Sequence, residues 1–236
     1  MKLPISVVIV ASVAIGCKGG GSSGGSAYVP TPPPKIEPAS VKAGEEATLF
    51  PITVGNAWTY SATTSVRTKQ GSRQGTKDAT FKVTKVEDVA GGKRATLELL
   101  MDGKAVDKQV WLVNAKGVYQ VSVGIAKPRL FSTPIPAITF PIETGSKFSW
   151  QGGDGKAKMA YNNEVTGAEE VDTEMKRMSA IAVDSKGTSV TGVTTEKTDR
   201  TIWFAPGIGI VRIRESTSSP VGASELLLSL KSTTVK

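Results

Sequence analysis

The side chains that carry out most enzyme chemistry are scarce in this sequence of 236 residues. The chain contains no histidine and one cysteine, Cys17. Without an imidazole it has no Ser-His-Asp or Cys-His arrangement, no zinc site built on histidines, and no histidine to titrate near neutral pH. The chemistry that remains is carboxylate catalysis, serine paired with lysine, or a reaction at the single thiol.

Carboxylates are densest at Glu169, Glu170, Asp172 and Glu174. Paired carboxylates could hydrolyse a glycosidic bond or bind calcium. Charges of this kind beside a loop are also typical of a solvated surface, and we favour that interpretation. A carboxylate-dependent hydrolase therefore ranks behind a binding role and a structural role.

Two glycine-rich segments lack the features of nucleotide sites. Residues 152–156 have neither the spacing of a phosphate loop nor its terminal serine or threonine, and residues 205–209 lack the third glycine and following helix of a dinucleotide site. The sequence therefore predicts no cofactor, no metal ligand and no catalytic residue.

Cys17 stands where a short apolar leader gives way to a glycine- and serine-rich segment. The leader begins with Lys2 and has small residues before the break, as in a secretory signal peptide. It is too short to span a bilayer, which needs about 20 apolar residues. Residues 14–17 (Ala-Ile-Gly-Cys) resemble the lipobox of bacterial lipoproteins, although alanine replaces the commoner leucine. This resemblance predicts a signal peptide over residues 1–16 and an acylated cysteine as the first mature residue.

Two or three acyl chains, palmitate among them, would anchor the protein stably, because each buried methylene contributes about 0.8 kcal/mol. We therefore expect a lipid-anchored protein of the cell envelope, in contact with membrane lipid through Cys17. Lys18 at the next position favours the outer membrane if the cell is Gram-negative. The alternative is an ordinary cleaved signal peptide with an incidental cysteine.

Residues 17–47 are predicted to form a tether and residues 48–236 a β domain. The tether is rich first in glycine and serine and then in proline, which favours a flexible part followed by a stiffer one. The formal charge of the chain is +8, and a secreted basic domain would meet anionic lipid or wall polymers, not nucleic acid. A solvated basic surface is the alternative explanation.

Residues 49–60 and 139–150 resemble each other. They share Phe, Pro, Ile and Gly, and residues 111–119 and 203–211 form a second similar pair at a comparable offset. Two matches at one spacing predict a duplicated unit. The predicted parts are repeat one at about 48–125, repeat two at about 138–216 and a closing strand at about 223–233.

Each unit shows the alternation of antiparallel strands. The predicted strands are residues 57–67, 79–86, 95–101 and 108–113, then 157–165, 176–184, 189–197, 201–204 and 210–215. Residues 69–77 are predicted to be a polar tip and 184–187 a turn, whereas 169–178 fit either a helix or an extended segment. We expect a mainly β fold, an antiparallel curved sheet or open barrel built from two similar repeats, with little helix.

Trp58, Tyr60, Phe148 and Trp150 follow the repeated proline–glycine turns. Core packing is the favoured role for these side chains. They could instead form a platform for sugars or acyl chains, since Trp and Tyr serve both purposes. They are therefore the candidate ligand-contacting aromatic residues.

The motif Phe-Pro-x-x-x-Gly-x-x-Trp-x-Tyr at residues 50–60, followed by Trp-Phe-Ala-Pro-Gly-Ile-Gly-Ile-Val at residues 203–211, is similar to a broad group of uncharacterised bacterial envelope lipoproteins. The resemblance spans residues 49–215 in outline and implies no catalytic residue. By architecture alone, a lipid-anchored curved sheet also resembles the carriers that localise lipoproteins, whose concave face holds acyl chains. We favour a non-catalytic binding module for lipid, glycan or a protein partner.

The alternative is a structural or assembly lipoprotein that displays basic loops to other envelope components. Arg67, Lys69, Arg73 and Lys77 are the candidate contacts with an anionic surface.

Replacing Cys17 with alanine tests the anchor. The variant should move from the sedimenting membrane fraction to the soluble fraction, because no acyl chain would remain to hold it. Fractionation and immunoblotting measure the distribution, and mass spectrometry of the native protein reports the modification. Ser22→Ala, in the same segment, is the control and should continue to sediment. An unchanged distribution of Cys17→Ala would contradict lipid anchoring.

Overall fold

The computed structural model describes residues 37–41 and 44–235. Its strands form a twelve-stranded antiparallel sheet in which β12 pairs with β1. The predicted signal peptide, Cys17 and most of the predicted tether lie outside the described residues. The strands are β1 (Ala57–Thr68), β2 (Gly71–Val89), β3 (Gly92–Met101), β4 (Lys104–Asn114), β5 (Gly117–Val123), β6 (Arg129–Thr139), β7 (Lys147–Gly153), β8 (Lys158–Asp172), β9 (Arg177–Thr191), β10 (Thr194–Ala205), β11 (Gly209–Ser219) and β12 (Gly222–Thr233).

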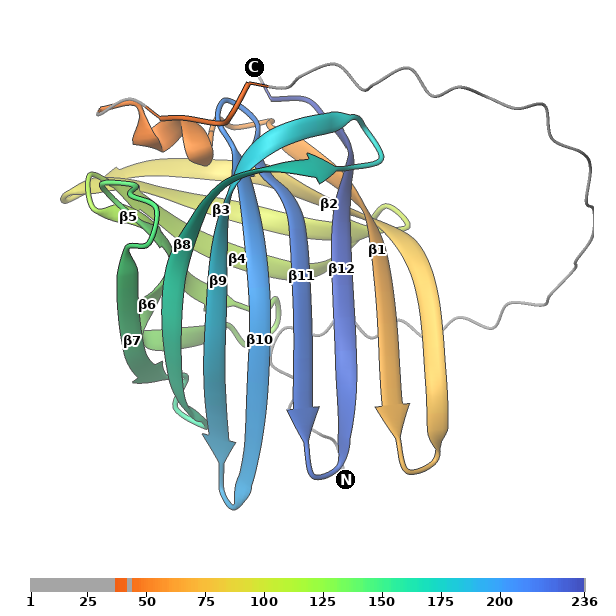
Figure 1. Cartoon of the computed structure of the whole chain (residues 1–236). Helices are drawn as coiled ribbons and strands as arrows, with labels where there is room; N and C mark the ends of the chain where they lie inside the picture. Colours follow the sequence, from red (N-terminus) through yellow and green to blue (C-terminus); the bar gives the residue numbers. More distant parts are fainter. Residues whose placement is uncertain (1–36, 42–43, 236) are drawn as a thin grey trace, which may run out of the picture.

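The sheet curls into a nearly closed barrel (Figure 1). Strands β8 to β12 and β1 form the layer nearest the viewer, and β3 to β6 cross behind it. The sheet order begins at β6 and ends at β7, and these two edge strands contact each other. Within the described ranges, the helical structure is the 3₁₀ turn η1 (Glu46–Leu49). The predicted fold class, a mainly β open barrel with little helix, is confirmed.

Alternating apolar side chains fill the interior, which explains why these segments form strands. Along β1, Trp58, Tyr60 and Ala62 are buried, and the residues between them are partly exposed. Their partners on β12, Leu230 for Tyr60 and Leu228 for Ala62, are buried as well. The first and last strands therefore share one core.

One end of the barrel is closed by η1 and the β10–β11 turn. Gly207 in that turn donates its N–H to the Thr48 carbonyl at 3.0 Å. The indole Nε1 of Trp58 donates to the Ile208 carbonyl at 2.6 Å. Phe50, which follows η1, is buried against the same indole. The glycine-rich segment at 205–209 thus serves the packing of the closed end.

Two predicted elements of the second repeat are wrong. The turn predicted at 184–187 lies inside β9, and the strand predicted over 189–197 contains the β9–β10 turn. Small residues occupy this part of β9 because side chains of β8 fill the space beside them. The Ser185 hydroxyl donates to Asn163 Oδ1 at 2.6 Å, and a Cβ at Gly187 would overlap the Tyr161 ring.

Other predicted segments also differ from the observed strands. The polar tip predicted over 69–77 is largely the start of β2, and residues 169–178 form the end of β8, a turn and the start of β9. Strands β5, β6 and β7 were not predicted. Strand β6 contains Pro134 and Pro136, which cannot donate ladder hydrogen bonds, and an edge strand tolerates them.

The two segments predicted to be repeats enter β1 and β7 with the same backbone pattern. Gly55 donates to the Val83 carbonyl at 3.0 Å, and Gly145 donates to the Val165 carbonyl at 2.7 Å. Both glycines have positive φ, +92° and +83°, which glycine adopts without strain. A register shift follows each of these valines, in β2 and in β8. The two halves share one sheet, and their duplication stays a prediction.

The seam between β6 and β7 has no backbone ladder among the described strands. Side chains bridge it instead. Ser132 Oγ accepts the Gly153 N–H at 3.0 Å, and Thr133 Oγ1 donates to the Gln151 carbonyl at 3.3 Å. Beneath the seam lies an apolar cluster separate from the main core, formed by Ile135, Trp150 and Met159.

Asp154, in the β7–β8 turn, forms an ion pair across the seam. Its Oδ2 accepts from Arg129 Nη1 at 2.9 Å, and its Oδ1 accepts the N–H groups of Lys156 and Ala157 at 3.0 and 2.9 Å. The Asp154 side chain is 2 % exposed. Burial alone would raise the pKa of Asp154, but the two backbone donors and the Arg129 cation hold this pKa below its ordinary value.

Replacing Asp154 with alanine should lower the free energy of unfolding by about 1.5–3 kcal/mol at neutral pH, the range for hydrogen bonds to a charged group. Because the folded-state pKa is lowered, this stabilisation is present above the unfolded-state pKa of aspartate and is lost as pH falls through the folded-state pKa. Urea unfolding at neutral and acidic pH should therefore show the two proteins converging in acid.

The control is Glu164→Ala, which removes an exposed pair with Lys147 at 3.4 Å and should change stability little. A loss for Asp154→Ala no larger than that of the control would contradict a stabilising role for the seam contact.

Candidate ligand-binding site

The barrel contains a cavity of ≈ 470 Å³ between the two layers. Pockets for small ligands typically measure about 300–1,000 Å³. Aromatic and aliphatic side chains dominate both walls of this cavity. One wall includes Trp58, Tyr60, Phe81, Leu97, Leu99 and Trp111, and the other includes Ile202, Ile210, Ile213, Leu226 and Leu228.

Hydrogen bonds fix the aromatic part of the wall. The Tyr60 hydroxyl donates to the Ile210 carbonyl at 2.6 Å, and Trp111 Nε1 donates to Gln109 Oε1 at 3.1 Å. Burial raises the pKa of Tyr60 well above its ordinary value, so the hydroxyl remains a donor at all physiological pH values. The apolar wall is therefore held in place before any ligand binds.

Exposed residues of the cavity lining lie near the β3–β4 and β5–β6 turns. Val106 is 49 % exposed, and Lys127 is also exposed. Arg129, the partner of Asp154 in the seam, lines the same part of the cavity. The cavity therefore opens toward these turns, with cationic side chains beside the opening.

A polar group lies at the β10–β11 side of the interior. Arg200 and Glu215 are opposite each other on these strands, and both line the cavity. Tyr161 on β8 lies against Arg200, whose guanidinium carbon is 5.5 Å from the ring centroid. Burial raises the pKa of Glu215 against the opposing effect of the Arg200 charge, and burial also raises the pKa of Tyr161 and of Glu196 on β10. We call these four residues the interior polar group.

The predicted ligand-contacting aromatic residues occupy three places. Trp58 and Tyr60 line the cavity. Trp150 is 7 % exposed and lies in the apolar cluster beneath the seam, with its ring centroid 5.7 Å from that of Tyr161. Phe148 is partly buried and packs against the main core. The structure therefore brings two of the four to the cavity itself and places Trp150 beside the interior polar group.

The predicted basic contacts lie on the β1–β2 hairpin, on different faces. Arg67 is opposite Ser72, whereas Arg73 is opposite Val66 and Lys77 is opposite the buried Ala62. Because side chains alternate along a strand, Arg67 lies on the outer face and Arg73 and Lys77 on the inner one. Lys69 is at the turn, and Lys77 pairs with Asp102 at 3.0 Å. They do not form one continuous basic patch.

The predicted acidic cluster lies at the β8–β9 turn and is exposed. Glu169 accepts a hydrogen bond from Trp203 Nε1, and Glu170 pairs with Arg177. Asp172 is 3.8 Å from the same guanidinium. These carboxylates have protein partners outside the cavity. Within the described chain, no group of three or more Asp, Glu, Cys or His side chains is arranged to hold a metal ion.

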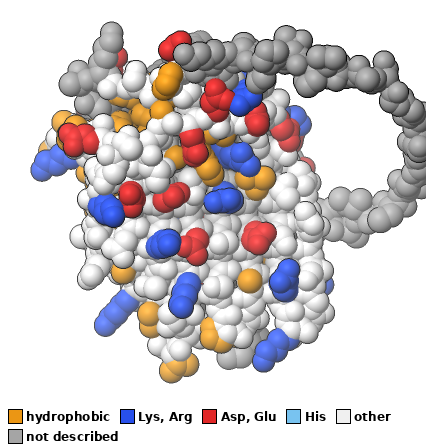
Figure 2. Space-filling model, in the orientation of Figure 1, with side chains coloured by type: hydrophobic (Ala, Val, Ile, Leu, Met, Phe, Trp, Pro, Cys, Tyr) orange, Lys and Arg blue, Asp and Glu red, His pale blue; other side chains and the backbone are white. Residues whose placement is uncertain are grey.

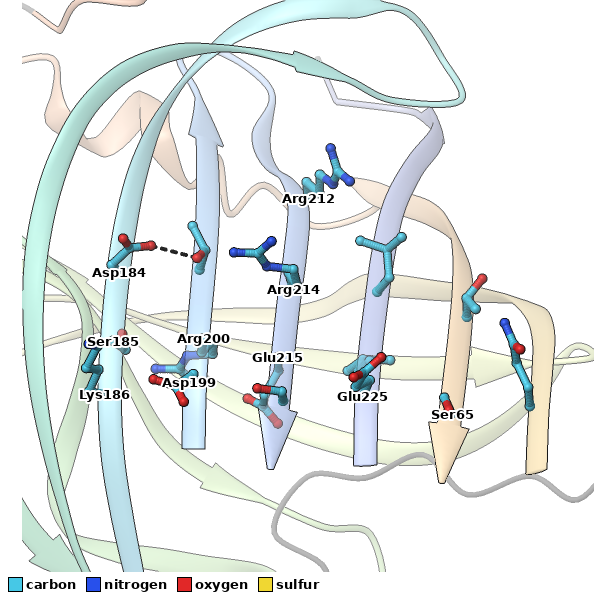
Figure 3. A pocket seen from close by; sticks show the side chains of 16 residues that line it. Ser65, Asp184, Ser185, Lys186, Asp199, Arg200, Arg212, Arg214, Glu215 and Glu225 are labelled. Atoms are coloured by element: carbon cyan, nitrogen blue, oxygen red, sulfur yellow. Dashed lines mark hydrogen bonds between the residues drawn. The ribbon is translucent and has the colours of Figure 1, made fainter. Parts of the chain in front are cut away.

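A polar depression of ≈ 660 Å³ lies mainly on the outer face of β9 to β12, β1 and β2 (Figure 3). Charged side chains of both signs line it, among them Asp184, Lys186, Asp199, Arg214 and Glu225. Figure 2 shows acidic and basic side chains intermixed over this face. Mixed exposed charge is typical of a solvated exterior, so we place the candidate site in the interior cavity.

Sequence analysis missed the interior polar group. Ile213 and Glu215 alternate on β11, so the available indication was a charged residue at an inward position of a predicted strand. Leu226 and Leu228, the lining residues farthest along the sequence from Trp58, belong to the predicted closing strand. Nothing in the local pattern indicates that β12 lies against β1 and faces the same cavity.

No helix among the described residues is long and apolar enough to cross a membrane.

No protein-family model and no curated protein matches this sequence. The fold is similar to the crystal structure of a candidate lipoprotein from Parabacteroides distasonis, with a TM-score of 0.50 and 14 % identity over 78 % of this chain and 97 % of that one. A candidate exported protein with a YmcC-like fold from Bacteroides fragilis gives a TM-score of 0.46 and 16 % identity over the same shares. The chain therefore shares its β fold with the Parabacteroides protein, a likeness that concerns the fold alone.

Proposed function

We propose that the protein is a membrane-anchored envelope lipoprotein whose barrel binds the acyl chain of an amphipathic lipid without catalysing a reaction on it. The observation that carries this proposal is the ≈ 470 Å³ cavity with fixed aromatic and aliphatic walls. Burying apolar ligand surface there would contribute about 25 cal/mol per Å². The preformed walls would lower the cost of ordering the site.

An acyl chain suits the cavity better than a glycan or a protein segment. Sugar recognition needs polar atoms along the walls, but Trp58 and Tyr60 already use theirs on backbone carbonyls. The remaining side chains of the two walls are mainly hydrocarbon. Polar groups lie near the opening and at the β10–β11 side, an arrangement that matches a long apolar chain with a polar end.

Binding accounts for the cavity better than hydrolysis. The described residues of its lining include the carboxylates Asp107 and Glu215 but no serine, threonine or cysteine that could act as a hydroxyl or thiol nucleophile. Gln109 Nε2 lies 3.4 Å from Asp107 Oδ2, so this carboxylate has a neighbouring donor. The acidic cluster that could have supported a hydrolase lies outside the cavity.

An envelope location is supported by the sequence and by the relative. Residues 14–17 resemble a lipobox, and the apolar leader precedes them. The Parabacteroides protein with the same fold is named a candidate lipoprotein. A lipid-binding barrel tethered to a membrane would work next to a source of its ligand.

Fluorescence quenching by 9,10-dibromostearate tests the proposal directly. Bromine quenches indoles that it contacts, and Trp58 and Trp111 line the cavity whereas Trp150 and Trp203 do not. The full chain carrying Cys17→Ala should show saturable quenching. The quenching should persist in the Trp203→Phe variant and be largely lost in Trp58→Phe/Trp111→Phe. Absence of saturable quenching in the parent protein would overturn the proposal.

Filling the cavity should block binding. Met101→Trp replaces a lining side chain with a larger, aromatic one. It should weaken dibromostearate binding about tenfold or more, which corresponds to a loss of binding free energy of about 1.4 kcal/mol or more. The matched control is Leu112→Trp, because Leu112 is partly exposed on β4 and is not part of the lining. Quenching titrations measure affinity, and thermal unfolding checks that both variants fold. Equal affinities for the two variants would contradict the cavity as the binding site.

A further inference from the structure

Arg200 has an unsatisfied donor inside the barrel. Its Nε is buried and has no hydrogen-bond partner among the described residues. Glu215 is its direct neighbour across the β10–β11 ladder (Figure 3), yet no ion pair joins the two side chains. The guanidinium instead lies over the ring of Tyr161. The Arg200 cation on the cavity wall is therefore near the Glu215 carboxylate, but no hydrogen bond joins the two among the described residues.

Trp150 provides a second unsatisfied donor beside the same ring. Its indole is tilted by 36° to the Tyr161 ring at a centroid distance of 5.7 Å, and its Nε1 is buried without an acceptor in the described residues. Leaving a buried donor unpaired costs the full desolvation free energy of that group. The two unpaired donors thus belong to side chains that contact the same tyrosine ring.

The guanidinium of Arg200 favours an anionic acceptor. Its buried Nε has no acceptor among the described residues. A negatively charged oxygen is the acceptor that a guanidinium binds most strongly. Burial raises the pKa of Glu215 and of Glu196, the two carboxylates of the interior polar group.

We propose that Arg200 and Trp150 bind the oxyanion of the ligand's head group, a carboxylate or a phosphate, while its acyl chain occupies the cavity. This inference rests on the proposed lipid-binding function. Arg200 lines the cavity, so the chain and the head group would be continuous. Guanidinium binds both oxyanions through paired N–H donors, and such charge-assisted bonds are about twice as strong as neutral ones.

The cations near the opening are less suited to this role. Arg129 already pairs with Asp154 at 2.9 Å, and Lys127 is exposed and hydrated. A head group there would compete with the seam contact or gain only a screened surface interaction. Arg200 has no hydrogen-bonded carboxylate among the described residues, and its Nε is unpaired.

Displacement of dibromostearate by three ligands of equal chain length tests the assignment. Dodecanoate and dodecyl phosphate carry oxyanions, and dodecanol carries none. On the full chain with Cys17→Ala, at least one oxyanion should bind about tenfold or more tightly than dodecanol. Arg200→Gln should lower oxyanion affinity about tenfold and leave dodecanol unchanged. The tighter of the two anionic ligands identifies the head group.

Two variants complete the test. Arg214→Gln is the control, because Arg214 is opposite Thr201 and points to the outer face, and it should change no affinity. Trp150→Phe keeps an aromatic ring but removes the Nε1 donor, and it should weaken the oxyanions selectively even if Arg200→Gln proves unstable in thermal unfolding.

The possible outcomes separate the two proposals. If all three ligands bind equally to the parent protein, or if Arg200→Gln and Trp150→Phe weaken all three alike, the head-group assignment is wrong and lipid binding stands. If none of the ligands displaces dibromostearate and dibromostearate itself fails to bind, the proposed function is wrong.

Discussion

The pairing of β12 with β1 is the contact on which the barrel depends. The ladder extends from Trp58 and Thr233 at one end to Thr68 and Gly222 at the other. Because β6 and β7 share no ladder among the described strands, this pairing is what joins β1–β6 to β7–β12 through backbone hydrogen bonds. It also brings Tyr60 against Leu230, which lets both layers bury one core. Such long-range pairing carries a loop-closure cost that the shared core must offset.

The interior changes in polarity from the closed end to the seam. Near η1 the side chains are apolar and closely packed, and the aromatic hydroxyl and indole of β1 bind carbonyls of β10 and β11. Farther along the strands the same inward positions hold Arg200, Glu215 and Tyr161. A protein interior normally fills its volume and pairs its polar atoms. At Arg200 a buried donor without an acceptor adjoins the cavity, and this departure from both rules is the physical basis of the head-group proposal.

The sequence alone predicts the fold class well, because alternation at two-residue spacing is strong in β1, β3 and β4. It fails where a local pattern conflicts with the packing environment. Ser185 and Gly187 have the composition of a turn, but Asn163 and Tyr161 on β8 fill the space above them. Pro134 and Pro136 argue against a strand, and only the edge position of β6 makes one acceptable.

The candidate site, like the fold, could be predicted from the sequence only in part. Trp58 and Tyr60 could be selected from their residue types and from their place after a turn motif that recurs within the chain. The interior polar group could not, because Arg200, Glu215 and Tyr161 come together only through the pairing of β8 to β11 and the curvature of the whole sheet.

The unladdered junction between the edge strands has a mechanical consequence. Separating two hydrogen-bonded strands breaks a row of cooperative backbone bonds, whereas parting β6 from β7 breaks the Asp154–Arg129 pair, two hydroxyl contacts and the apolar contacts of the cluster beneath the seam. The seam is therefore the line along which the barrel would open without breaking a strand ladder among the described residues. A ligand too wide for the cavity would be accommodated at the least cost there.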